Sequence, residues 1–81
     1  MDKLFEGVLR SEYPEPMKRQ LLERLVNDGA FKANISESDL KAIFSLAFSY
    51  ILSYESSHFR RSIGAMILIA FSSGQALFLD R

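Results

Sequence analysis

The sequence predicts a small all-α fold, a bundle or orthogonal array of about four helices in one domain spanning residues 1–81. Apolar residues recur at helical spacing in four segments, and no segment alternates with the two-residue period of a half-buried strand. The connections between these segments are short and contain proline, glycine, asparagine and serine. Helices joined in this way pack as bundles or crossed arrays.

The first two helices are predicted at residues 2–10 and 15–28. Asp2 is placed to cap the first, which should form only by docking its apolar side chains against the rest of the chain. The prolines of the SEYPEP turn end it and suit the first turn of the second helix. Gly29 follows an amphipathic stripe and is expected to be a left-handed C-cap, with AFKAN as a link to the next helix.

The third helix is predicted at residues 37–54 and is apolar around most of its circumference. Ser36 with Asp39 three residues later is a variant of the capping box, which indicates where the helix begins. Its weakly polar positions form one narrow strip: Lys41, Ser45, Ser49 and Ser53. Such a helix is expected to be central in the fold or covered by a partner.

The fourth helix is predicted at residues 58–79, with Ser56 or Ser57 as its N-cap. Its segment Ser62–Leu79 contains no charged residue. A length near the roughly 20 residues that cross a bilayer allows a membrane-associated protein. Gln75, the serines and both glycines disfavour that alternative, and the small residues indicate a close helix–helix contact instead.

A chain of this size has little interior to cover two helices that are apolar nearly all round. We therefore expect a homo-oligomer, with a two-fold dimer favoured over a self-contained monomer. The residues expected to mediate self-association are Ile63, Ile67, Ala70, Phe71, Gly74 and Phe78.

Composition excludes or disfavours several classes of function. There is no cysteine for a disulfide or a thiolate site, and ten basic residues balance ten acidic ones, which disfavours a nucleic-acid binder. The only histidine, His58, has no metal-ligating or catalytic partners at a recognisable spacing, and the glycines are isolated. We expect no enzymatic activity, no metal and no cofactor. The N-terminal segment does not resemble a secretory signal, so a cytoplasmic location is expected.

Arg60 and Arg61 are unusual because the first turn of a helix disfavours cations. They should either form ion pairs with Glu55 or with acidic residues of the first two helices, or contact an anionic partner.

The sequence therefore predicts a non-catalytic helical protein that acts through protein–protein interaction, in a regulatory or adaptor role. One alternative is a ligand-binding sensor, in which Tyr50, Tyr54 and Gln75 line a pocket between the last two helices. The other is the small membrane-associated protein described above.

Overall fold

A computed structural model of the chain describes the backbone of residues 1–79 and the side chains of residues 1–72. It contains α1 (Lys3–Leu9), α2 (Glu15–Val26), α3 (Gly29–Asn34), α4 (Glu37–Leu52) and α5 (His58–Leu79). The predicted all-α class is confirmed, and no strand occurs in residues 1–79. The predicted number of helices was too low by one, because the AFKAN segment is helical rather than a link.

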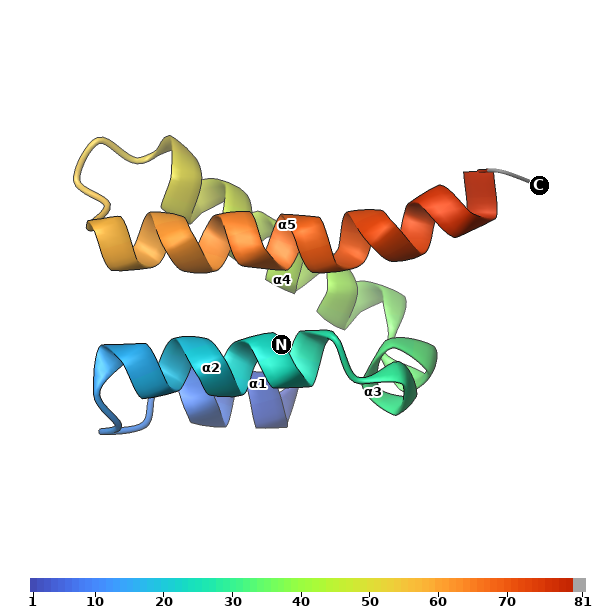
Figure 1. Cartoon of the computed structure of the whole chain (residues 1–81), viewed down its shortest axis with the longest axis horizontal. Helices are drawn as coiled ribbons and strands as arrows, with labels where there is room; N and C mark the ends of the chain where they lie inside the picture. The colour runs from blue at the N-terminus through green and yellow to red at the C-terminus, as the bar shows by residue number, and fades with distance from the viewer. Residues whose placement is uncertain (80–81) are drawn as a thin grey trace.

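The helices form two layers around a shared interior (Figure 1). α4 and α5 are an antiparallel pair that makes the most extensive helix–helix contact, and α2 packs along α5 and runs in the same direction. α1 packs on α2, and the short α3 turns the chain from α2 into α4. The longest helix, α5, therefore packs against α4 in its own layer and against α2 in the other layer.

Capping interactions fix the beginnings of three predicted helices. The Asp2 carboxylate accepts a hydrogen bond from the Phe5 N–H at 3.0 Å, and the Ser36 hydroxyl accepts one from the Asp39 N–H at 3.1 Å. At the start of α5, the Ser57 hydroxyl accepts from the Arg60 N–H at 3.2 Å. Of the two serines that the sequence left open, Ser57 is therefore the N-cap.

The end of α2 differs from the prediction. α2 stops at Val26, and Gly29 begins α3 instead of capping α2. No glycine in the described chain has positive φ. The reason is local: the Asp28 carboxylate accepts a hydrogen bond from the Phe31 N–H at 2.9 Å, so Asp28 acts as an N-cap and starts a new helical turn.

α4 also ends earlier than predicted, at Leu52 rather than Tyr54. Ser53 is extended, with φ −75° and ψ 131°, and this turns the chain toward α5. Tyr54 consequently lies in the connection between the two helices and is 99% exposed.

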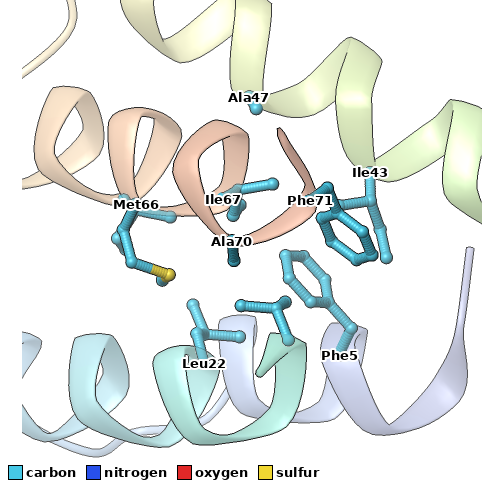
Figure 2. Close-up of a cluster of buried hydrophobic side chains, with 10 residues drawn as sticks. Phe5, Leu22, Ile43, Ala47, Met66, Ile67, Ala70 and Phe71 are labelled. Carbon is cyan, nitrogen blue, oxygen red and sulfur yellow. The ribbon is translucent and has the colours of Figure 1, made fainter. Parts of the chain in front are cut away.

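The core lies between the two layers, where α5 meets α1, α2 and α4 (Figure 2). Phe5 of α1 and Leu22 of α2 point toward α5, and Ile43 and Ala47 reach it from α4. The Phe44 and Phe71 rings meet edge to face, with centroids 5.5 Å apart. The buried residues are Phe5, Leu22, Val26, Ile43, Ala47, Ile63, Met66, Ile67, Ala70 and Phe71. Full burial stabilises each large apolar side chain by about 1.5–3 kcal/mol, so this cluster holds the helices together.

Candidate functional site

Four of the six residues predicted to mediate self-association lie in the core of a single chain. Ile63 and Ile67 are fully buried, and Ala70 and Phe71 are 4% and 7% exposed. They pack on α1, α2 and α4 of the same molecule. Helical spacing shows that a face is apolar but not which element covers it. In a single chain these four residues are covered, and their part in self-association stays a prediction. Gly74 and Phe78 lie outside the residues whose side chains are described.

The close helix contact expected from the small residues of α5 occurs within the chain. A Cβ atom on Gly64 would lie 2.7 Å from the Ala47 carbonyl oxygen and 2.9 Å from Ile51 Cγ1. Gly64 thus allows the backbones of α4 and α5 to approach closely.

Arg60 and Arg61 stabilise the turn between α4 and α5. The Arg60 guanidinium lies over the Tyr50 ring, 5.7 Å from its centroid, and Arg61 Nη2 donates to the Ser53 carbonyl oxygen at 3.3 Å. Neither arginine has an ion pair within the described part of the chain, so the predicted pairing with Glu55 is absent there. The carbonyl groups at the end of α4 attract cations, which explains arginines at this position. Both side chains are exposed, and contact with an anionic partner stays a prediction.

The predicted ligand pocket is not assembled. Tyr54 is 99% exposed in the connection, whereas the Tyr50 ring is covered by Arg60 at the beginning of α5. Gln75 lies about four helical turns, roughly 22 Å, further along α5 than Arg60. Tyr50 and Tyr54 therefore do not line a common cavity, and Gln75 lies outside the residues whose side chains are described.

An apolar surface with two hollows lies over α1, α2 and α3. Two adjoining hollows of about 480 Å³ and 300 Å³ share Leu4, Leu25 and Asp28. We call them together the α1–α3 groove. Its apolar lining consists of Leu4, Val8, Leu21, Leu25, Phe31 and Ile35. Leu4 is 65% exposed and Leu21 is half-buried. The other four are half-buried against the core.

Charged side chains border this groove. Asp2 and Asp28 lie on its edge, and each uses one carboxylate oxygen to cap a helix. Arg24 lies one helical turn before Asp28 and has no ion pair within the described residues. The groove therefore combines an apolar floor with a basic group on α2 and the acidic N-cap residues of α1 and α3.

Sequence reasoning missed this surface because it treated the apolar residues of α2 as one core stripe. They occur as two adjacent pairs, Leu21-Leu22 and Leu25-Val26. The second member of each pair is fully buried, while the first faces α1 and the groove. The sequence signal for this surface was the width of the apolar stripe. Two adjacent apolar pairs cover more of the helix circumference than packing against a single neighbouring element requires.

A second, smaller hollow of about 270 Å³ lies between α2 and α5. At its edge, Arg19 Nε donates to the Ser62 hydroxyl at 2.7 Å, and an Arg19 nitrogen lies 3.7 Å from a Glu23 oxygen. These polar groups already satisfy each other and join the two helices at the surface.

Within the described residues, no three histidine or acidic side chains gather where they could hold a metal ion. In the same part of the chain, no helix has the length and hydropathy needed to cross a membrane. No protein-family model matches the chain, and no solved structure matches its fold.

Proposed function

We propose that this chain is a non-catalytic helical protein that acts through protein–protein interaction and associates with itself as a two-fold homodimer. A regulatory or adaptor role and a cytoplasmic location, both expected from the sequence, belong to this proposal. It rests on the amount and the chemistry of the surface that one chain leaves open.

The observation that carries the proposal is the exposure of large apolar side chains. Leu4 on α1 is 65% exposed, and Ile69 on α5 is 67% exposed.

Much of the open surface is apolar. Large hydrophobic side chains are exposed on several helices, among them Leu4 on α1, Phe48 and Leu52 on α4, and Ile69 on α5. Leu52 is 75% exposed and Phe48 is 49% exposed. Burial of apolar area contributes about 25 cal/mol per Å², so covering these side chains favours association.

The two alternatives receive no support from the geometry. A ligand-binding sensor needs Tyr50, Tyr54 and Gln75 to converge, and they are distributed along α4, the connection and α5. The membrane-associated alternative needs a spanning or surface-bound apolar helix, but α5 directs its buried face into the core.

The proposal is tested by measuring the solution mass by multi-angle light scattering and sedimentation from about 1 µM to 1 mM, the range in which many specific complexes dissociate. We expect the mass to rise toward twice 9.2 kDa as concentration increases. A mass of one chain at every concentration would refute self-association. A parallel run in high salt shows whether charged groups contribute to the contact.

A further inference from the structure

We infer that the larger hollow of the α1–α3 groove binds a basic amphipathic helix of a partner protein. This hollow, of about 480 Å³, is called the α3 hollow below and is lined by Asp2, Leu4, Leu25, Asp28, Ala30, Phe31, Asn34 and Ile35. The inference rests on the proposed protein–protein interaction and states the chemistry of the partner. Apolar side chains of the partner enter the hollow, and a lysine or arginine beside them meets the two carboxylates at its edge.

The α3 hollow has an apolar floor that is formed in the single chain. Leu4, Leu25, Phe31 and Ile35 contribute to it from α1, α2 and the α3 segment. Amphipathic helices dock into such grooves through apolar side chains at positions i, i+3 or i+4, and i+7. An extended peptide would need the free edge of a sheet, and no strand occurs in residues 1–79. A helix is therefore the form of partner that this surface suits.

The polar edge of the α3 hollow offers free acceptor oxygens. Asp2 and Asp28 each use Oδ1 to cap a helix, and Oδ2 of each has no hydrogen bond within the described residues. The Asn34 amide nitrogen donates to the Ala30 carbonyl oxygen at 2.8 Å, which leaves Asn34 Oδ1 without a hydrogen bond in the same part of the chain. The N–H groups of a lysine or arginine side chain can satisfy these oxygens.

The charge at this edge is negative although two helices begin there. The N-terminus of a helix carries about half a positive elementary charge, whereas each aspartate carries a full negative one. No lysine or arginine lines the α3 hollow. Asp2 and Asp28 also have no ion pair within the described residues. A cation on the partner is thus complementary to this edge.

Other hollows and apolar surfaces of the described chain lack this acidic edge. Arg19 borders the hollow between α2 and α5, Arg10 borders one on the outer face of α1, and Arg24 borders the smaller hollow of the groove. On α4, Glu37 and Lys41 lie 3.4 Å apart and neutralise each other. Among these surfaces, a basic helix is attracted most strongly to the α3 hollow.

The test selects partners from a displayed library of helical peptides about five turns long. Leucines are fixed along one stripe, and the flanking positions vary among lysine, arginine, glutamate, glutamine and serine. We expect peptides selected on the wild-type chain to be enriched in lysine and arginine. When these residues are replaced by glutamate in a selected peptide, its dissociation constant should rise about tenfold or more.

Two conservative variants test the carboxylates without removing the helix caps. Asp2→Asn and Asp28→Asn each keep a capping oxygen and lose the negative charge. We expect each to weaken binding of the selected basic peptide about fivefold, the order of effect of one lost charge pair, while circular dichroism and thermal unfolding stay close to wild type. Glu37→Gln is the matched control on α4, and its affinity for the peptide should equal that of the wild type. Amide chemical shifts should change around Leu25 and Phe31 when the peptide is added.

The outcomes separate this inference from the proposed self-association. Selected peptides without a basic excess, affinities unchanged in both aspartate variants, or shift changes confined to α4 would each overturn binding at the α3 hollow. Failure to select any helical peptide would overturn it as well. None of these results affects self-association, which is measured by light scattering with no peptide present. Weaker binding in Asp2→Asn and Asp28→Asn, but not in Glu37→Gln, supports the inference.

Discussion

Gly64 of α5 lies directly against the backbone of α4 at Ala47: a methyl group on Gly64 would come 2.7 Å from the Ala47 carbonyl oxygen. A carbonyl oxygen within a helix cannot move aside independently, because it is held by its own hydrogen bond. The contact therefore sets how closely the two helices of the α4–α5 pair approach. The absence of a side chain at Gly64 thus serves the folding of a single chain.

Gly64→Ala is expected to destabilise the fold by about 1–3 kcal/mol, the usual cost of overpacking a close contact. The better helix propensity of alanine, worth up to about 1 kcal/mol, offsets only part of this. Urea denaturation measures the difference. Gly7→Ala is the matched control, since Gly7 is helical and has nothing within 4 Å of an added Cβ. It should be neutral or slightly stabilising. Equal stabilities of the two variants would show that the α4–α5 contact is not close at Gly64.

Ile67→Val tests whether the buried face of α5 stabilises the single chain rather than a contact between two copies. Ile67 is fully buried among side chains of its own chain. Loss of one methylene there should cost about 0.5–1.5 kcal/mol and leave the dissociation constant of the dimer unchanged. Ile69→Val is the control on the same helix, at a residue that is 67% exposed, and its effect on unfolding should be smaller. If Ile67→Val changed the dissociation constant without loss of monomer stability, the face of α5 that carries Ile67 would contact the second copy after all.

Lys32→Met tests a polar contact between α3 and α5. Lys32 Nζ donates a hydrogen bond to the Ala70 carbonyl oxygen at 3.0 Å and lies 6.0 Å from the centroid of the Phe71 ring. Methionine keeps the apolar stem and removes the charge, so the loss should be about 1 kcal/mol. Lys41→Met is the control, because its i,i+4 ion pair with Glu37 is highly exposed and contributes little. Chemical denaturation of both variants decides whether Lys32 holds α3 against α5.

Ser57→Ala and Ser56→Ala compare two adjacent serines of which one is a helix cap. Ser57 accepts the Arg60 N–H, and we expect its replacement to reduce thermal stability by about 1 kcal/mol. Ser56 contributes only its backbone N–H, to the Ser53 carbonyl oxygen, so Ser56→Ala should be nearly neutral. The reverse order of melting temperatures would mean that α5 begins one residue earlier.

The prediction from sequence was most accurate where the deciding interaction is local. Asp2 and Ser36 were identified as N-caps because the donor of each capping bond lies three residues away in the chain. It was least accurate where two local signals compete. At Asp28-Gly29, a glycine C-cap and an aspartate N-cap are both reasonable, and the helical turn that follows Asp28 is the one that forms.

The candidate site was predicted poorly for a related reason. Leu21 and Leu22 are adjacent and equally apolar, and the sequence does not distinguish the one that is fully buried from the one that borders the groove. Likewise, Tyr50 and Gln75 belong to the two helices that pack against each other, but the register of the antiparallel pair places them far apart. Register depends on close contacts such as Gly64 against Ala47.

By itself, the sequence determined that the chain is all-helical, where four of its helices begin, and that its second half is too apolar to be fully solvated. These properties depend on capping bonds and apolar spacing within a few residues. Only the tertiary structure decided that the face of α5 with Ile63, Ile67 and Phe71 is covered by its own chain, and that apolar side chains stay exposed at Leu4 and Leu52. Helical periodicity defines a face, but the element that covers it is selected by packing between residues distant in the chain.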